Sequence, residues 1–459
     1  MRRQPVGLLL AGLLLGATPL AAQSLRGRSS TTVGYAQLRP IRYDSAAGQY
    51  RALPLAYAAP LTQDVELSAW GLGVPGLRAY GLLRWRGALG SELVWPRSND
   101  HFDALYAYLE LERPLYRVRA GRQQRASGLG WYAYDGLTAT WRPRATVRLE
   151  TYGGRGLARG FLEPVSSPAL AALDPLRPDH GTILLGASAW YAPDRVTTLT
   201  TVYQRELLSD RSGLVTERAA FDARVGLGSH LVLSASVDAD LVAEDWGKAR
   251  AGALVRFAGT NFLELELFRY RPVLDLTTIW GVFSPQAHKG ASATLRVAPV
   301  RGVLLSPTCA VRRYEPVEST TPFLVGVDDN AWQCGVTARG ARGDFLASGS
   351  YQLQTGFGGA QSAGDASFAY APPSGWRVGV RATAFQQEET FRVTDGTVYG
   401  AGADAKLQLG DRLTLRGDVM RFFHRRLQGQ VGLDWSQTRG QVAVEWVFGA
   451  NPDRARAPR

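Results

Sequence analysis

The chain has 459 residues, of which 20% are charged and 45% are apolar, and this balance excludes a disordered or collagen-like protein. Its two cysteines exclude a disulfide-framework protein and a multi-cysteine zinc module. The formal net charge is +12, but Lys occurs only at Lys248, Lys289 and Lys406, and there is no run of five basic residues. The Arg excess fits a GC-rich genome better than selected anion binding, and no nucleic-acid partner is expected.

Residues 1–22 are predicted to form a secretory signal peptide. Arg2 and Arg3 precede the apolar stretch GLLLAGLLLGATPL, and small residues follow it, so cleavage is expected after Ala22. Beyond this point no apolar stretch reaches the ~18 residues that a transmembrane helix requires. The mature chain is therefore expected outside the inner membrane, as either a soluble β protein or an outer-membrane barrel.

The rest of the chain alternates between apolar and polar residues with a period of two, which is typical of β-strands. Clear examples are residues 105–112, 231–243, 248–257 and 399–409, where Ala, Val and Leu share one face and charged residues share the other. Such segments are longer than the ~6 residues of an average soluble strand and match a tilted strand that crosses a bilayer. An apolar face opposite a charged one fits lipid outside and water inside.

Ten short connections join these segments into pairs. Longer, more variable connections link one pair to the next. The short connections fall near residues 74–76, 113–114, 142–144, 192–194, 228–229, 259–260, 299–300, 340–342, 372–374 and 410–411. Short periplasmic turns and longer extracellular loops are typical of outer-membrane barrels. We predict an all-β fold: one transmembrane antiparallel up-and-down barrel of about 22 strands (18–24) over residues 23–449, then a polar tail, 450–459. A sandwich or a propeller is disfavoured because no blade-length repeat is present.

The charged face of such a barrel would line a lumen rich in Arg. The predicted pore-lining, anion-facing residues are Arg78, Arg84, Arg86, Arg117, Arg119, Arg250, Arg256, Arg377 and Arg381. Since guanidinium groups bind carboxylate and phosphate, they would favour anions. The alternative is a self-neutralising network that braces the wall, with pairs such as Asp240 opposite Arg250.

Two further features leave alternatives open. The longest predicted loop, residues 153–180, contains Ser166 and Pro168 at the start of a possible short helix, and it would either narrow the pore or form an external lid. Cys309 and Cys334 fall on successive strands in the lipid-facing register. They would form a cross-strand disulfide or remain two unpaired thiols.

A short segment resembles one known family. Gly121-Arg122-Gln123, followed by Gly128 and then Asp135-Gly136, is similar to a pattern in alginate-export-type porins. The resemblance covers little more than residues 115–136. It implies an 18-stranded barrel with an Arg-rich lumen for acidic polysaccharide, in which Arg117, Arg119 and Arg122 face the polymer, whereas the residue pattern places Arg122 where the strand ends.

These observations predict a channel in the bacterial outer membrane for small polar or anionic solutes or acidic polysaccharide. Its partners would be outer-membrane lipid and, during biogenesis, the barrel assembly machinery. The alternative is a structural barrel that sheathes a periplasmic partner such as a multiheme cytochrome, which would be another chain because Cys309 and Cys334 are too far apart for a heme-attachment motif. No catalytic residues, metal or cofactor are expected, since the histidines are scattered: His101, His180, His230, His288 and His424.

Overall fold

The computed structural model describes residues 24–39, 41–91, 101–159, 182–209, 213–271, 287–315, 329–356, 359–389, 396–426 and 434–449. The predicted signal peptide (1–22), the polar tail (450–459) and the predicted short helix after Ser166 lie outside these ranges. Within the described residues, no helix is both long and apolar enough to span a membrane.

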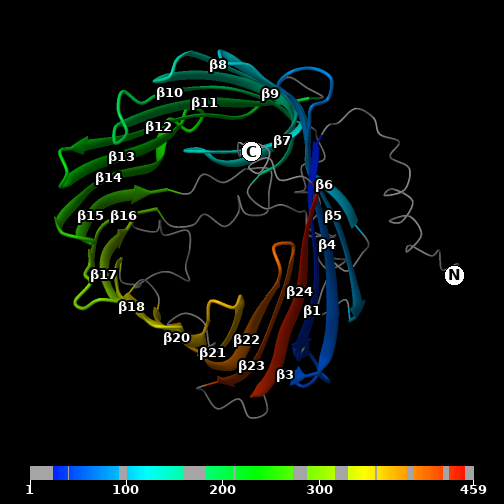
Figure 1. Ribbon diagram of the computed structural model, residues 1–459. Helices are drawn as coiled ribbons and strands as arrows, with labels where there is room; N and C mark the ends of the chain where they lie inside the picture. The colour runs from blue at the N-terminus through cyan, green and yellow to red at the C-terminus, as the bar shows by residue number, and fades with distance from the viewer. Residues whose placement is uncertain are drawn as a thin grey trace, which may run out of the picture.

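The structure is built from β-strands that form one closed ring (Figure 1). The strands of the ring are β1 (Ser24–Leu38), β4 (Ala56–Trp70), β5 (Leu77–Gly90), β6 (His101–Glu112), β7 (Tyr116–Ser127), β8 (Gly130–Arg144), β9 (Val147–Arg159), β10 (Thr182–Tyr191), β11 (Thr198–Leu208), β12 (Leu214–Leu227), β13 (Leu231–Asp240), β14 (Asp245–Ala258), β15 (Asn261–Tyr270), β16 (His288–Arg296), β17 (Val303–Tyr314), β18 (Asn330–Arg342), β19 (Phe345–Gly356), β20 (Gly359–Tyr370), β21 (Trp376–Glu389), β22 (Gly396–Leu409), β23 (Leu413–Arg426) and β24 (Trp435–Gly449). A separate hairpin, β2 (Ile41–Asp44) and β3 (Gln49–Ala52), lies in the connection between β1 and β4.

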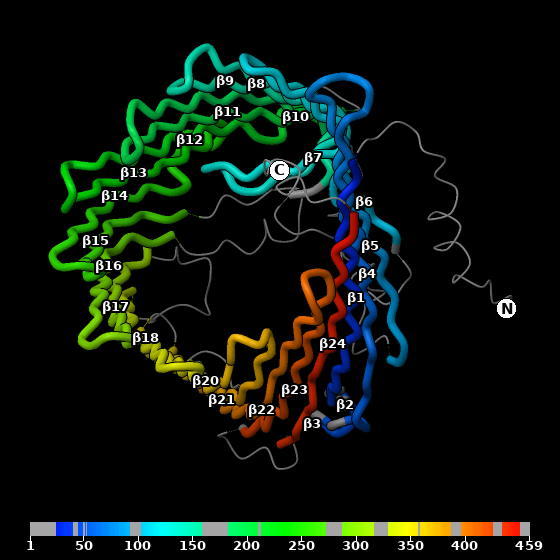
Figure 2. Tube along the Cα trace, in the orientation of Figure 1, coloured from blue at the N-terminus to red at the C-terminus, as the bar shows by residue number. Residues whose placement is uncertain are grey.

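The predicted 22-stranded antiparallel barrel is confirmed. Each strand pairs with its neighbours in chain order, and β1 closes the ring by pairing with β24, where Val33 lies opposite Val442. Closure removes the exposed edges that an open sheet would present. The closed ring can be followed in Figure 2. With strands about 4.8 Å apart and tilted by roughly 40°, a circular ring of 22 strands would be about 40 Å across.

Ten connections at one end of the barrel, here called the turn end, contain two to six residues each. Two predicted turns were misplaced: β8 continues through Arg144, and β18 continues through Arg342 to a turn at Gly343, whose φ of 57° favours glycine. In the turn between β10 and β11, the Asp194 carboxylate accepts hydrogen bonds from the backbone N–H groups of Val196 (2.8 Å) and Thr197 (2.7 Å). These bonds lower the pKa of Asp194, because they stabilise the ionised form.

At the other end, here called the loop end, one predicted pairing was wrong. The segment predicted over residues 231–243 ends at Asp240, whose Oδ1 accepts hydrogen bonds from the N–H groups of Val242 and Ala243, both at 3.0 Å. The turn and a register shift in β14 place Ser236, not Asp240, opposite Arg250. An aspartate that caps its own turn therefore ends the strand earlier than hydrophobic alternation suggests.

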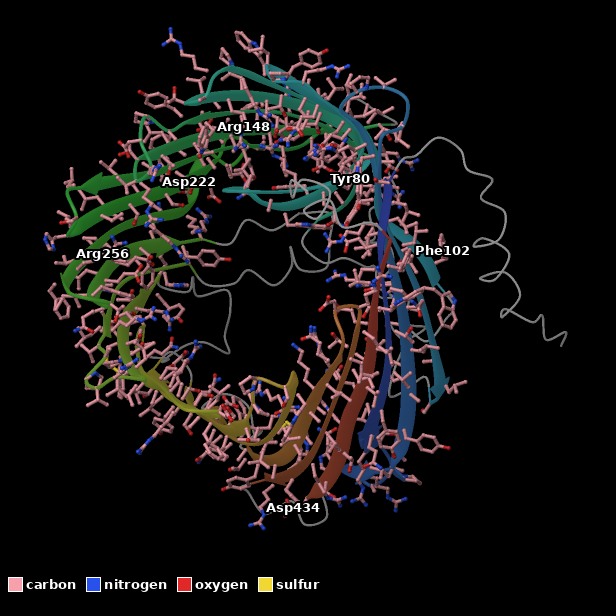
Figure 3. The ribbon with its side chains drawn as sticks, in the orientation of Figure 1. Tyr80, Phe102, Arg148, Asp222, Arg256 and Asp434 are labelled. Carbon is pink, nitrogen blue, oxygen red and sulfur yellow. A yellow bond between two sulfur atoms is a disulfide. The ribbon has the colours of Figure 1, made fainter. Side chains whose placement is uncertain are left out.

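The outward face carries a band of exposed apolar side chains bordered by aromatic rings. Near the turn end these rings are Tyr116, Trp141, Tyr191, Phe257, Phe345, Phe368, Trp376 and Trp446, and near the loop end they are Phe102, Trp246, Trp332, Tyr399 and Phe423. In Figure 3, Phe102 points away from the barrel, whereas Tyr80 and Arg148 point into it. An apolar band between two aromatic girdles is the surface that a transmembrane barrel presents to lipid.

Two features of the outward face pair polar or reactive groups locally. Next to the seam between β1 and β4, the Gln63 Nε2 donates to Ser29 Oγ at 2.9 Å, and the Thr31 hydroxyl bonds the Gln63 Oε1. On β17 and β18, Cys309 and Cys334 lie directly opposite each other and form a disulfide. Both features keep polar or reactive atoms paired on a surface that otherwise carries hydrocarbon.

Candidate functional site

The interior of the barrel is marked by side chains that bridge strands that are not neighbours. Arg125 on β7 contacts Glu150 on β9 and donates from Nη2 to the Ser188 Oγ on β10 at 2.9 Å. The Tyr106 hydroxyl on β6 donates to Glu66 on β4 at 2.8 Å. Side chains converge on the concave side of a curved sheet, so these contacts identify the charged face as the inner one.

One sector of this inner face is rich in guanidinium groups, and we call it the basic wall. We define it by nine inward side chains of β5–β9, namely the cations Arg78, Arg117, Arg119, Arg125, Arg142 and Arg148 and the acids Glu110, Glu112 and Glu150. Arg84 and Arg86, nearer the loop end of β5, pair with Asp64 and Asp103 and are not included. Six positive charges therefore face three negative ones. The imbalance makes the local potential positive, and low-dielectric walls strengthen such a field.

Glu110 is the centre of the basic wall. Its Oε2 accepts a hydrogen bond from Arg119 Nε at 2.7 Å and lies 4.0 Å from Arg117 Nε, and its Oε1 lies 4.0 Å from Arg78 Nη1. The Glu110 side chain is only 4% exposed, whereas that of Arg78 is 44% exposed. The carboxylate therefore lies against the sheet, and the guanidinium groups lie between it and the lumen.

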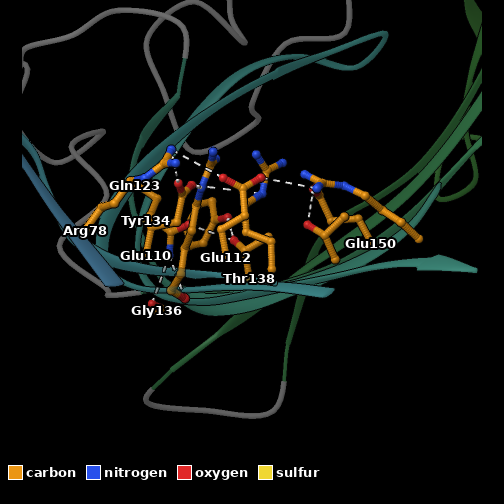
Figure 4. A network of polar contacts seen from close by, with 12 residues as sticks. Arg78, Glu110, Glu112, Gln123, Tyr134, Gly136, Thr138 and Glu150 are labelled. Atoms are coloured by element: carbon orange, nitrogen blue, oxygen red, sulfur yellow. Dashed lines mark hydrogen bonds and ion pairs between the residues drawn. The ribbon is translucent and has the colours of Figure 1, made fainter. Parts of the chain in front are cut away.

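The other two acids hold further Arg side chains in the same way (Figure 4). Glu112 lies 3.3 Å from Arg78 Nη1 and accepts a hydrogen bond from Arg142 Nη1 at 3.2 Å. Glu150 is bonded by Arg125 and accepts from the Thr140 hydroxyl at 2.9 Å. Each acid is shared or supported by a second group, so the guanidinium groups are fixed in position without being fully neutralised.

Aromatic rings support three of the cations. Arg119 lies over the Tyr108 ring at 5.3 Å, Arg125 over Tyr152 at 4.2 Å, and Arg148 over Trp190 at 5.1 Å. Arg148 is exposed and makes no ion pair among the residues that the structure describes. A cation held by a ring keeps its full charge for the lumen, because cation–π contact orients it without an opposing carboxylate.

A network of hydrogen bonds between uncharged side chains joins β7 to β8 next to the basic wall (Figure 4). The Thr138 hydroxyl donates to Gln123 Oε1 at 2.8 Å and contacts the Tyr134 hydroxyl at 2.6 Å, and Gln123 Nε2 donates to the Gly136 carbonyl at 3.1 Å. Gln123, Tyr134 and Thr138 are buried. Since buried polar groups are costly unless paired, this closed network fixes β7 against β8 beside the cations.

The tip of the β7–β8 hairpin bends into the lumen, as Figures 1 and 2 show. Its turn at residues 128–129 reaches β12, where Arg218 Nη1 donates to the Leu129 carbonyl at 3.1 Å and to the Tyr132 hydroxyl at 3.2 Å. Gly128 lies so close to β12 that an added Cβ would be 2.6 Å from Asp222 Oδ2. The hairpin therefore crosses the inner face of β9, β10 and β11 and narrows the passage.

Apolar packing holds the bent hairpin in place. The buried cluster beneath it consists of Leu129, Tyr132, Tyr134, Tyr152, Leu184, Val202 and Ala220. Leu184, Val202 and Ala220 project inward from β10, β11 and β12, where a water-filled lumen would favour polar residues. Arg218 also donates to Asp238 Oδ2 at 2.7 Å, so the residue that anchors the tip is itself fixed.

The wall opposite the hairpin is largely neutral. It forms a groove of about 720 Å³ lined mainly by hydroxyl and amide side chains such as Ser292, Thr308 and Gln333. Two cations and two acids also line it, so their charges cancel: Arg250, Arg312, Glu266 and Asp365. The inner surface is therefore basic on one side and neutral-polar on the other. No group of His, Cys, Asp and Glu side chains among the described residues could hold a metal ion.

Each of the nine predicted pore-lining residues lies on the inner face, but only some lie together. Arg78, Arg117 and Arg119 belong to the basic wall. Arg84 pairs with Asp64 at 2.7 Å, Arg86 with Asp103 at 2.5 Å, and Arg381 with Asp418 at 2.7 Å. Arg250 and Arg377 lie 3.8 Å from Glu266 and Asp404, and Arg256 lies near the turn end of β14. For the paired residues the self-neutralising alternative describes the geometry well.

Two functional residues were missed and one was misplaced. Arg142 was assigned to a turn and no role was predicted for Arg125, whereas longer β7 and β8 strands place both on the basic wall. Arg122 lies in the middle of β7 rather than at its end, and on the outward face, where it pairs with Asp135 through bonds of 2.8 and 3.0 Å. Period-two alternation from Arg119 would have placed Arg122 on the opposite face.

No protein-family model matches the chain, and no curated protein matches it. Several solved structures are similar to the chain in outline. Acinetobacter baumannii OccAB2 has 10% identity over 95% of this chain and 100% of its own, with a TM-score of 0.43. Pseudomonas aeruginosa OccK1 (OpdK) has 13% identity over 93% and 99%, with a TM-score of 0.41. Pseudomonas aeruginosa OccK2 (OpdF), in complex with glucuronate, has 10% identity over 93% and 98%, with a TM-score of 0.41. At these values the strand pairing of the chain itself, not the likeness, establishes the barrel.

Proposed function

We propose that the protein is an outer-membrane channel that passes small anionic solutes. The observation that carries this proposal is the layering of the basic wall, where the buried Glu110 carboxylate lies behind the partly exposed guanidinium groups of Arg78 and Arg119. A solute in the lumen meets the cations first. Fixed positive charges along a pore attract anions and repel cations, and guanidinium groups match carboxylate and phosphate geometry.

The inward hairpin gives the basic wall its influence over permeation. In an open barrel about 40 Å across, salt would screen a wall charge within about 8 Å at physiological ionic strength. Because the tip of β7–β8 crosses to β12, the open cross-section is smaller and more of the passage lies close to the charged side chains. Several Arg side chains in series, none fully neutralised, would let an anion move from one to the next without being trapped.

The outward surface supports the proposed location in the bacterial outer membrane. An apolar band bordered by exposed rings such as Trp332 and Trp446 is suited to a bilayer, and a closed barrel satisfies the backbone without water. The ten short connections of the turn end would then face the periplasm. The barrel assembly machinery would be the partner during biogenesis.

The size of the solute is the second part of the proposal. The resemblance to alginate-export-type porins implied 18 strands and an inward Arg122, but the barrel has 22 strands and Arg122 faces outward. The hairpin also occupies part of the lumen, held by Arg218. We therefore propose a small carboxylate or phosphate as the solute in preference to acidic polysaccharide.

Liposome swelling with matched sugars tests the proposal. Purified protein in liposomes is challenged with gluconate, glucose and glucosamine, which are similar in size but carry negative, zero and positive charge. The expected order of entry is gluconate, then glucose, then glucosamine. Equal rates, or faster entry of glucosamine, would contradict the anion preference, and liposomes that do not swell with any solute would favour the sheath alternative.

A further inference from the structure

Three cations lie side by side on the outward face of the barrel near the loop end. Arg269 on β15 is directly opposite Lys289 on β16, and Lys289 is directly opposite Arg313 on β17. Like charges in directly opposed positions destabilise a sheet, since their Cβ atoms are only about 5 Å apart. This arrangement, here called the cation row, therefore calls for a counter-charge.

Nearby carboxylates neutralise only the two ends of the cation row. Arg269 lies 3.5 Å from Asp245 and 3.7 Å from Glu315, and Arg313 lies 3.3 Å from Asp329. These distances exceed the ~2.8 Å of a strong charge-assisted hydrogen bond. Lys289, at the centre, is exposed and makes no ion pair or side-chain hydrogen bond with any residue in the described ranges. The positive charge of Lys289 therefore has no counter-charge between Arg269 and Arg313.

An apolar groove begins directly below the cation row, toward the middle of the barrel. The next in-register positions are Ala251, Leu267, Ala291 and Val311, which alternate small and large side chains. Leu267 and Val311 are 65% and 57% exposed and stand on either side of Ala291. The cation row and these residues line a shallow, largely open groove of about 620 Å³.

The height of the groove matches the edge of a bilayer. Trp332 is directly opposite Val311 and belongs to the aromatic girdle of the loop end. Tryptophan concentrates at membrane–water interfaces, where lipid headgroups lie. The cation row is therefore at headgroup level, and the groove below it is at the level of the first acyl carbons.

We propose that this groove binds a phosphorylated lipid of the outer leaflet, with its phosphate at Lys289 between Arg269 and Arg313 and one acyl chain over Ala291. The inference rests on the membrane location given under the proposed function, but not on the anion preference of the lumen. The positive charge of the cation row is complementary to a phosphate group. The alternation of small and large apolar side chains along the groove leaves room for an acyl chain. A free phosphate ion would use the cation row but not the groove.

Native mass spectrometry of the detergent-solubilised barrel tests the proposal. The probes are a bis-phosphorylated lipid A, the same lipid with its phosphates removed, and inorganic phosphate. Wild-type protein should retain the phosphorylated lipid, and Lys289→Gln should retain about fivefold less, since one cation at a membrane surface contributes that much to binding. Lys289→Arg should restore retention. The matched control is Lys248→Gln, because Lys248 is one strand from Arg269 at nearly the same height but faces the lumen.

Each outcome decides the proposal. Equal retention by wild type and Lys289→Gln, or equal retention of the lipid without phosphates, would overturn it. If inorganic phosphate competes fully with the lipid at equal concentration, the cation row binds a free anion. That result would also overturn the proposed lipid site. Channel conductance of the same samples separates the two proposals: a conducting wild-type barrel that fails to retain phosphorylated lipid refutes only this inference.

Discussion

Glu110 shows how a single residue shapes the lumen. Its carboxylate is buried and lies within 4.0 Å of guanidinium groups of Arg78, Arg117 and Arg119. A buried carboxylate is costly unless paired, so removing one of these Arg side chains would change both the field and the stability of the wall. Glu110 thus acts through the cations that it positions rather than through its own charge.

Arg148 offers a cleaner test of charge, because it contacts the Trp190 ring and leaves no carboxylate unpaired when removed. Arg148→Gln should lower the anion-to-cation permeability ratio about fourfold at low salt, because a unit charge at about 10 Å in water stabilises an anion and destabilises a cation by about 0.4 kcal/mol each. The measurement is the reversal potential in a KCl gradient. The matched control is Arg195→Gln, which removes the same charge from the exposed β10–β11 turn and should leave the ratio unchanged.

At the scale of elements, the β7–β8 hairpin is the part that the sequence did not predict. Its turn at residues 128–129 is as short as the turns at the opposite end. The sequence suggested a constriction only at the loop of residues 153–180, which was predicted with equal weight to narrow the pore or to form an external lid. Residues 153–159 belong to β9, and the rest of that loop lies outside the described residues. A signal was present: Leu184 and Val202 are apolar on an otherwise polar face. Strand alternation alone does not say what covers them, because the cover comes from distant residues.

Displacing the hairpin tip should widen the pore. A Cβ at Gly128 would lie 2.6 Å from Asp222 Oδ2 and 3.0 Å from the Ala220 Cβ, so Gly128→Val should push the tip away from β12. We expect a larger single-channel conductance and a weaker anion preference, since the solute path moves away from the basic wall. The control is Gly81→Val, because Gly81 has open space around it. Unchanged conductance in Gly128→Val would show that the tip does not limit the pore.

At the scale of the whole molecule, the sequence was most informative where one physical rule applies to every strand. Alternation sets which side chains meet lipid, and the short turns set the strand count, so the 22-stranded barrel followed from pattern alone. Individual pairings were less predictable. Asp240 was paired with Arg250 in the prediction, but a turn and a register shift separate them. Such local irregularities depend on capping and bulges that alternation does not record.

The assignment of faces predicts opposite effects for one substitution at adjacent positions. Val336 lies near the middle of β18 on the outward face, and Thr337 follows it on the inward face. Val336→Arg should destabilise the folded barrel in lipid vesicles by about 2–4 kcal/mol, whereas Thr337→Arg should cost less than about 1 kcal/mol. Urea titration of the folded fraction, followed by gel mobility without heating, measures both. Equal losses for the two variants would contradict the assigned faces.

The central claim is that the barrel encloses a water-filled, positively charged passage, and the reversal potential of the wild-type protein in a planar bilayer tests it most directly. With a KCl gradient across the bilayer, the account predicts stepwise ohmic currents that reverse near the chloride equilibrium potential. Currents that reverse near the potassium equilibrium potential would contradict the role of the basic wall. Bilayers that contain inserted barrels but stay silent would contradict the passage itself.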